Sequence, residues 1–202
     1  MSIVLSVLVL HCLFGPNRTG NRIDVYFFIV LSLAVLTASV PIRHELFERQ
    51  LGSSVERLLS MSSVVVDCNS YIDGWFYFNL AGFVYRGSSV IHLEVTTCKD
   101  LKRYLADPES ADRSALFALH VLTHEAMHVA GEFNEVVADC QAFQRNHKMA
   151  EQLGIQRPLA ATHAQQIHRT RSSRHPYYSS DCEPNRRLDE RLPDAVWQSS
   201  TR

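Results

Sequence analysis

The chain has little of several features that would assign it to a class immediately. Its 202 residues carry 20 Lys and Arg against 21 Asp and Glu, so it lacks the positive excess with which proteins neutralise nucleic-acid phosphates. Eight Gly and seven Pro are too few for a collagen-like or low-complexity chain. A hydrophobic share of 46% excludes a disordered protein, and 20% charged residues exclude a protein that crosses a membrane many times. We therefore expect one folded domain, with or without an appendage, and no nucleic-acid partner.

Charge is nearly absent from residues 1–42. Only Arg18, Arg22 and Asp24 are charged there, and the apolar run 25–42 has no charged residue. As a helix that rises 1.5 Å per residue, this run would measure about 27 Å, close to the roughly 30 Å of a bilayer's hydrocarbon core. It predicts a transmembrane anchor, and the two arginines before it place residues 43–202 outside the membrane. Two alternatives stay open: a signal peptide cleaved near the small residues 37–39, which would release a secreted protein, and a buried core helix.

Cysteine is also scarce, and no two cysteines have the CxxC spacing that is typical of a cysteine zinc site. Apart from Cys12, the chain holds an even number that suits two disulfides in an oxidising compartment: Cys68, Cys98, Cys140 and Cys182. Four cysteines allow three pairings, and their spacing does not choose among them. Four buried free thiols are the alternative. Two disulfides would agree with the export that the N-terminal run predicts.

Sequence patterns divide the remainder into a first half with strands and a second half rich in helices. A helix is expected at 46–59, and short β-branched and aromatic runs at 64–66, 75–78, 82–85 and 90–95 predict a small antiparallel sheet. Helices are expected at 111–129, 134–153 and 158–169, with Gly131 and Gly154 ending the first two and Asn134 capping the second. The expected fold class is α+β, with an N-terminal transmembrane or signal helix in 1–42, a small domain at 43–180 and a polar tail at 181–202.

Histidine is unevenly distributed, since seven of the ten lie between His120 and His175. They include the pattern HExxH, from His124 to His128, inside the helix expected at 111–129. Residues i and i+4 lie on one face of a helix, so both imidazoles can bind the same Zn²⁺. Glu125 can then face the open coordination position and take a proton from the metal-bound water. The simpler alternative for these residues is a polar helix face packed against the sheet.

Two carboxylates follow the motif, one turn apart on the next expected helix. Catalytic zinc sites often combine three protein ligands with an exchangeable water, and two His with one Glu is an established set. We expect Glu135 to be the third ligand and Asp139 to accept the free N–H of a ligating histidine. The alternative places Asp139 on the metal and Glu135 outside it. His120, one turn before His124, is expected to be a hydrogen-bonded neighbour that lines the cleft.

HExxH followed by a helix with Glu-x-x-x-Asp resembles the gluzincin zinc metallopeptidases. The resemblance implies a zincin-like domain in which His124, His128 and Glu135 bind Zn²⁺ and Asp139 supports the site. Residues 122–153, together with Cys182, Leu188 and Asp189, are also similar to a group of uncharacterised bacterial exported proteins. The spacing HExxHxxGxxH of the metzincins is followed only in part, because Asn134 stands in place of their third histidine.

The predicted function is that of a zinc-dependent metallopeptidase that acts on peptides or proteins outside the membrane. Attack on a carbonyl requires a hydrogen-bond donor for the oxyanion in addition to the metal. His175, Tyr177 and Tyr178 lie downstream of the motif and are the candidates for that donor. The alternative function is non-catalytic: an exported metal-binding or envelope interaction module in which the HExxH helix has a structural role.

Overall fold

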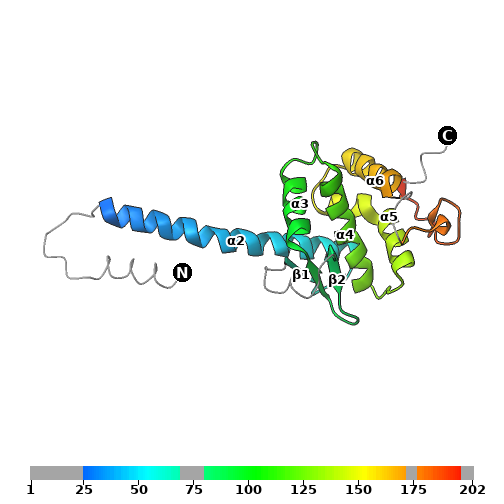
Figure 1. Ribbon diagram of the computed structural model, residues 1–202, viewed down its shortest axis with the longest axis horizontal. Coiled ribbons are helices and arrows are strands. Elements are labelled where there is room, and N and C mark those ends of the chain that lie inside the picture. The colour runs from blue at the N-terminus through cyan, green and yellow to red at the C-terminus, as the bar shows by residue number, and fades with distance from the viewer. Residues whose placement is uncertain (1–24, 69–79, 172–176, 197–202) are drawn as a thin grey trace. The chain divides into compact units, whose positions relative to one another are not determined.

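A computed structural model describes residues 25–68, 80–171 and 177–196. The chain divides into two compact units, one that ends at Phe47 and one that begins at Glu48. Helix α2 (Val25–Leu59) contributes residues to both units and contains Pro41 in the first (Figure 1). Within the described ranges, no helix combines the length and the apolar character needed to cross a bilayer. The anchor or signal at 25–42 therefore stays a prediction from the sequence.

The end of α2 is part of the second unit and includes most of the helix expected at 46–59. Its Leu51 and Val55 are fully buried. Two of its carboxylates accept hydrogen bonds from the backbone at both ends of the first strand. The N–H of Val64, just before the strand, donates to Glu56 over 3.0 Å, and that of Cys68 donates to Glu48 over 2.8 Å. These contacts fasten the start of the second unit to its sheet.

The sheet has three described strands, β1 (Val65–Cys68), β2 (Gly82–Val84) and β3 (Val90–Leu93), in the order β1-β3-β2. Strands β2 and β3 form an antiparallel hairpin, but β1 pairs with β3 in parallel. The expectation of an antiparallel sheet is therefore wrong for β1. A short turn forces β2 and β3 to run in opposite directions, whereas the longer connection 69–81 lets β1 join the far side of β3 in parallel. The strand expected at 75–78 lies outside the described residues.

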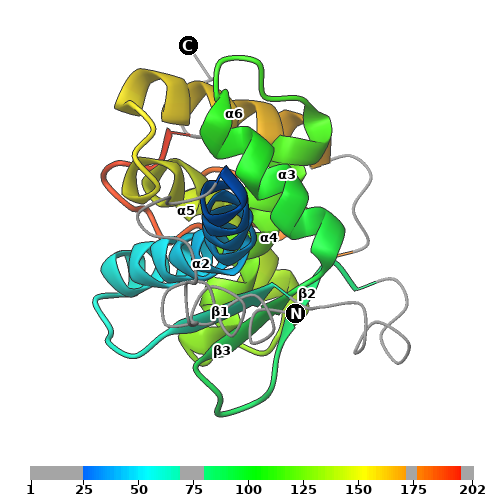
Figure 2. The ribbon, with the colours of Figure 1, turned by 90° about the vertical axis from the view of Figure 1, so that its left-hand side faces the viewer.

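Helix α4 (Arg113–Val129) is the central element of the second unit. It packs against α3 (Val95–Ala106), α5 (Glu135–Gln152), α6 (Arg157–Arg171) and strands β2 and β3 (Figure 2). Asp112 caps its N-terminus by accepting from the backbone N–H of Ala115 over 2.9 Å. Almost every residue from Ala115 to His128 is buried, because neighbours surround the helix. Helices α4, α5 and α6 match the three expected from the sequence to within two residues.

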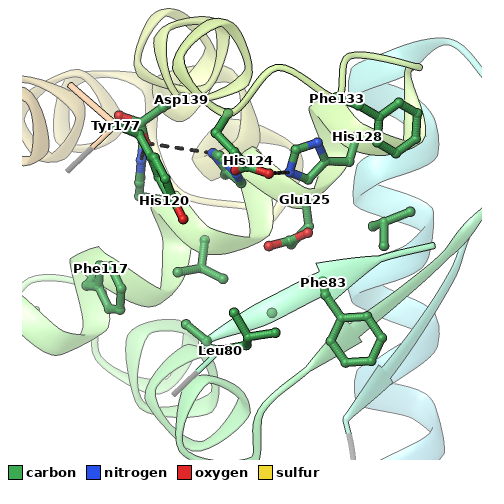
Figure 3. A pocket seen from close by; sticks show the side chains of 15 residues that line it. Leu80, Phe83, Phe117, His120, His124, Glu125, His128, Phe133, Asp139 and Tyr177 are labelled. Carbon is green, nitrogen blue, oxygen red and sulfur yellow. Dashed lines mark hydrogen bonds and ion pairs between the residues drawn. The ribbon is translucent and has the colours of Figure 1, made fainter. Parts of the chain in front are cut away.

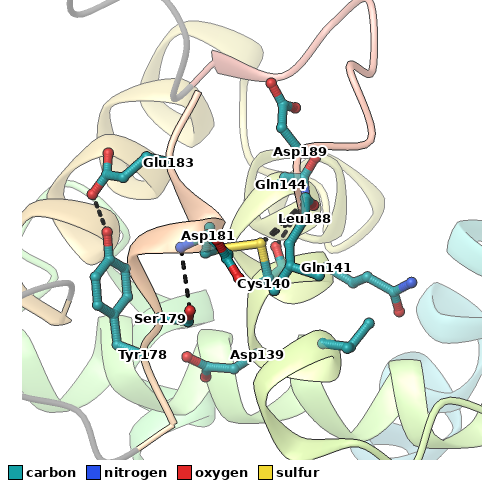
Figure 4. Close-up of a disulfide and its surroundings, with 12 residues drawn as sticks. Asp139, Cys140, Gln141, Gln144, Tyr178, Ser179, Asp181, Glu183, Leu188 and Asp189 are labelled. Atoms are coloured by element: carbon teal, nitrogen blue, oxygen red, sulfur yellow. Dashed lines mark hydrogen bonds between the residues drawn. A yellow bond between two sulfur atoms is a disulfide. The ribbon is translucent and has the colours of Figure 1, made fainter. Parts of the chain in front are cut away.

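Two disulfides join Cys68 to Cys98 and Cys140 to Cys182, which resolves the pairing that the sequence left open. The first links β1 to α3. The second links α5 to the short helix η1 (Ser180–Cys182) (Figure 4). The segment that follows, set apart as a tail in the sequence, also binds α5: the side chain of Gln144 donates to the carbonyl of Leu188 over 3.1 Å and accepts from the backbone N–H of Glu190 over 2.9 Å.

Candidate metal centre

The HExxH motif lies on helix α4, as expected, and its second histidine is placed close to the end of that helix. Gly131 ends α4 with a left-handed backbone, φ 98°, which glycine adopts without steric cost. The backbone N–H groups of Gly131 and Glu132 donate back to the carbonyls of His128 and Met127 over 3.0 and 3.1 Å. These two bonds form a Schellman turn. The turn reverses the chain within a few residues of the motif.

Asn134 begins the next helix, as the sequence predicted. Its side-chain oxygen accepts from the backbone N–H groups of Val136 and Val137 over 3.1 and 3.3 Å. Glu135 is consequently the first residue of α5 and lies against the face of α4 that carries the histidines. The Gly131 turn and the Asn134 cap together bring a carboxylate from one helix to two imidazoles of another.

Three donor groups converge at this point. Nε2 of His124 lies 3.1 Å from Oε2 of Glu135, and Nε2 of His128 lies 3.6 Å from Oε1 of the same carboxylate. Ligand atoms of these three residues lie within 4.8 Å of one another, so they can hold a metal ion. Two imidazoles and one carboxylate are chemically a zinc-binding set.

The ring of His128 is held from two sides. Its Nδ1 lies 2.6 Å from the carbonyl oxygen of Glu132, which can only accept, so Nδ1 carries the proton. Its face stacks on the ring of Phe133 at 5.7 Å between centroids. Nε2, which is the unprotonated nitrogen when this imidazole is neutral, faces Glu135. A backbone carbonyl that fixes the tautomer of a ligating histidine is a usual support for a metal site.

A second group of possible ligands lies deeper, around Asp139. Its Oδ1 accepts a hydrogen bond of 2.8 Å from Nε2 of His120 and lies 3.7 Å from Nδ1 of His124. The amide of Asn146 donates to Nδ1 of His120 over 3.0 Å. His120, Asp139 and Asn146 are all almost completely buried. Ligand atoms of His120, His124 and Asp139 also lie within 4.8 Å of one another, so these residues could hold a metal ion as well.

Carboxylates determine the electrostatics of His124. Burial by itself lowers the pKa of this imidazole, but Asp139 and then Glu125 and Glu135 outweigh it, and the net pKa lies above the usual value. The negative surroundings that favour a proton on His124 equally favour a metal cation beside it.

Glu125 is buried, with 4% of its surface exposed, and Figure 3 shows it on the opposite side of His124 from Asp139. Burial raises the pKa of its carboxyl to about 7, against a lowering by His124 and with a smaller rise from Glu135. Among the described residues no group makes a hydrogen bond to its Oε2. Gly82 of β2 leaves space for the Glu125 side chain, because a Cβ atom at this position would lie 3.0 Å from Cγ of Glu125. Such a carboxyl is suited to exchange protons near neutral pH.

These groups open into a pocket of about 420 Å³. Figure 3 shows His124, Glu125 and His128 on one side of it, with Leu80 and Phe83 across from them. Its remaining walls are mostly apolar and include Phe117, Val121, Phe133 and Tyr177. A pocket with apolar walls and a few converging polar groups is typical of a small-molecule or peptide site.

The two described candidates for the oxyanion donor differ in whether they line the pocket. Tyr177 lines the pocket. Tyr178 does not line it: its hydroxyl donates to Glu183, and its ring packs on Phe143 and His168. His175 lies outside the described residues.

Sequence reasoning missed three contributors to the site: Gly82, Phe133 and Asn146. Asn146 could have been found, because it lies two turns after Asp139 on the same face of α5 and within reach of the His120 that was expected nearby. Gly82 and Phe133 had no such signal, because their roles depend on how the sheet and the interhelical turn pack against α4.

No protein-family model matches the chain, and neither a curated protein nor a solved structure is significantly similar to it. Function is therefore inferred from the chemistry of the pocket.

Proposed function

We propose that the protein is a zinc-dependent metallopeptidase that hydrolyses peptide bonds outside the membrane. The observation that carries the proposal is the convergence of His124, His128 and Glu135 beside the buried carboxyl of Glu125. Two histidines and one glutamate leave a coordination position open in a tetrahedral zinc site. Zn²⁺ bound there would act as a Lewis acid, polarising a carbonyl and lowering the pKa of a water molecule.

The state of the imidazoles favours this donor set over the deeper one. His120 already donates to Asp139 and accepts from Asn146, so a metal on either nitrogen would break a buried hydrogen bond. In His128, by contrast, Nδ1 is bound to a carbonyl and Nε2 lies 3.6 Å from Glu135, so a metal on Nε2 would break no hydrogen bond of this ring to a described residue. We therefore assign Glu135 as the third ligand. Asp139 would lie behind His124, facing its other nitrogen.

Glu125 would be the general base. A carboxyl with a pKa of about 7 can accept a proton from an attacking water and return it to the amine that leaves. Oε2, which lacks a hydrogen bond among the described residues, is the atom available for that proton. The contact between Gly82 and Glu125 restricts the carboxyl on its other side.

The pocket walls suit a peptide. Residues 81–84 line the pocket, and its mostly apolar walls with a few converging polar groups complement peptide side chains and their backbone. The hydroxyl of Tyr177 is our candidate for the oxyanion donor, because Tyr177 lines the pocket and Tyr178 does not.

Two disulfides support a location outside the cytoplasm, because disulfides persist in oxidising compartments. Together with the apolar run 25–42, they favour a protein whose residues 43–202 are exported, either anchored by that run or released after its cleavage.

The test uses the full chain, purified with its disulfides intact. We expect one zinc per chain, cleavage of unstructured peptides, and loss of cleavage in Glu125→Gln with zinc retained. Glu135→Ala should lose the zinc as well. Glu109→Gln, at an exposed carboxylate on a loop, is the matched control and should behave as the wild type. Absence of stoichiometric zinc, or full activity in Glu125→Gln, would contradict the proposal.

A further inference from the structure

A second pocket shares one lining residue, Phe117, with the first. Its volume is about 200 Å³, and its walls come from α4 and from α6: Arg113, Leu116, Phe117, Gln166, Ile167 and Thr170. Phe117 also lines the pocket of the candidate metal centre, where Figure 3 labels it. The two pockets are therefore neighbours that share this side chain, and the function proposed above uses only the first.

The second pocket combines an apolar floor with one positive charge. Leu116 and Ile167 are buried. Phe117 is 37% exposed and is therefore one of the large apolar side chains that reach the surface. Among the described residues that line the pocket, Arg113 alone is charged, and no ion pair joins it to another described residue. A ligand with an apolar group next to a carboxylate complements this surface.

The distances along α4 relate the second pocket to the reacting centre. At 1.5 Å per residue, the helix rises about 10 Å from Phe117 to His124 and about 16 Å from Arg113 to His124. An extended peptide advances about 3.3 Å per residue. A peptide that follows the helix from the metal ligands would pass Phe117 about three residues away and Arg113 about five residues away.

We propose that the second pocket is a distal subsite for the peptide substrate. It binds an apolar side chain about three residues from the reacting carbonyl, and Arg113 binds a carboxylate about five residues from it. This inference rests on the proposed peptidase function. The carboxylate is that of an Asp or Glu side chain or the C-terminal carboxylate of the peptide, since both present the same two oxygens to a guanidinium.

The experiment reads out cleavage positions. The zinc-loaded full chain is incubated with a random peptide library, and mass spectrometry gives the residue preference at each distance from the cut. We expect Leu or Phe to be favoured near the third residue. Near the fifth, we expect about a fivefold preference for Glu over Gln or for a free C-terminus over an amidated one, the range of a partly exposed ion pair. The two comparisons at the fifth residue distinguish the two sources of the carboxylate.

Variants assign the preference to the pocket. Arg113→Glu should abolish or invert the acidic preference, and Phe117→Ala should weaken the apolar one. Arg186→Gln, at an exposed arginine away from both pockets, is the matched control and should keep both preferences. Cleavage without these preferences, or an acidic preference unchanged in Arg113→Glu, would contradict the proposed subsite but not the proposed peptidase activity.

A binding measurement separates the two proposals if no cleavage is found. Fluorescence anisotropy compares an acidic peptide, carrying Glu two residues beyond a Phe, with its Gln counterpart. If binding prefers the acidic peptide and is lost in Arg113→Glu, the second pocket is a peptide-binding site and the proposed peptidase activity is contradicted. Equal binding of both peptides together with no cleavage overturns both proposals.

Discussion

Nε2 of His124 lies 3.1 Å from Oε2 of Glu135, although the two residues belong to different helices. The contact depends on the turn between α4 and α5. Gly131 supplies the left-handed residue and Asn134 the cap, so Glu135 begins α5 directly beside the motif. The short interval between the motif and its third candidate ligand is therefore a consequence of a tight turn, and both residues that make the turn are visible in the sequence.

The two donor groups make opposite predictions for two histidines. If His124, His128 and Glu135 bind zinc, His128→Gln should weaken binding at least about 100-fold because a ligand is lost. His120→Gln should weaken it by only about 10–100-fold, the usual effect of losing a supporting hydrogen bond. Competition with a chromophoric chelator measures both dissociation constants. The reverse order, with His120→Gln the more severe, would assign the metal to His120, His124 and Asp139.

Asn146 tests whether the buried network behind His124 supports the metal. The Asn146 amide donates to His120, which donates to Asp139, which faces His124. Asn146→Leu should lower zinc affinity about tenfold, because His120 loses the partner that fixes its tautomer. The Co²⁺-substituted protein gives a second readout, since its visible spectrum reports ligand geometry. An unchanged affinity and spectrum, in a variant that is merely less stable, would reduce this network to a structural role.

The local parts of the site could be predicted from the sequence, because they depend on residues close together in the chain. HExxH, the glycine stop, the asparagine cap and the following carboxylates all lie within 16 consecutive residues, from His124 to Asp139. The pairing of β1 could not be predicted, because nothing local in Val65 to Cys68 determines which side of the hairpin the strand joins.

The close approach of Gly82 to Glu125 could not be predicted from the sequence for a similar reason. Glycine in a short strand pattern indicates a bulge or a close approach, but it does not say what approaches. Only the packing of β2 on α4 brings this position to the buried carboxyl of Glu125. The disulfide pairing likewise follows from tertiary structure, since Cys140 meets Cys182 because the C-terminal segment folds back onto α5.

If Glu125 is the general base, as proposed above, Gly82→Ala should impair catalysis without removing the metal. A Cβ atom at this position would lie 3.0 Å from Cγ of Glu125 and 3.0 Å from Cδ2 of Leu93, so the carboxyl must move. A small displacement of a general base can cost about 100-fold in rate. We expect kcat/KM to fall by about 10–100-fold while zinc content stays at the wild-type level. Gly87→Asn, at an open turn position whose positive φ asparagine tolerates, is the control and should keep full activity.

The Cys140–Cys182 disulfide should contribute strongly to stability. It closes a segment with a sequence separation of 42, for which the chain-entropy model gives about 4 kcal/mol. Replacing both cysteines by serine should lower the free energy of unfolding by about 2–4 kcal/mol, measured by denaturant titration without reductant. Addition of reductant should then cost the wild type more stability than it costs the variant. Equal stability of the two oxidised proteins would show that the packing of residues 183–196 on α5 suffices alone.

The buried His163 predicts a loss of stability in acid. Its Nδ1 lies 3.0 Å from the hydroxyl of Tyr104, and burial lowers the pKa of the imidazole below its usual 6.5. Below about pH 6.5, His163 therefore binds a proton in the unfolded chain but stays neutral in the folded protein. The free energy of unfolding consequently falls as the pH decreases toward the folded-state pKa. The slope from one such group reaches at most about 1.4 kcal/mol per pH unit. In His163→Gln, the free energy of unfolding between pH 7 and 5 should depend less on pH than in the wild type. An identical slope in the two proteins would mean that His163 titrates alike in the folded and unfolded states.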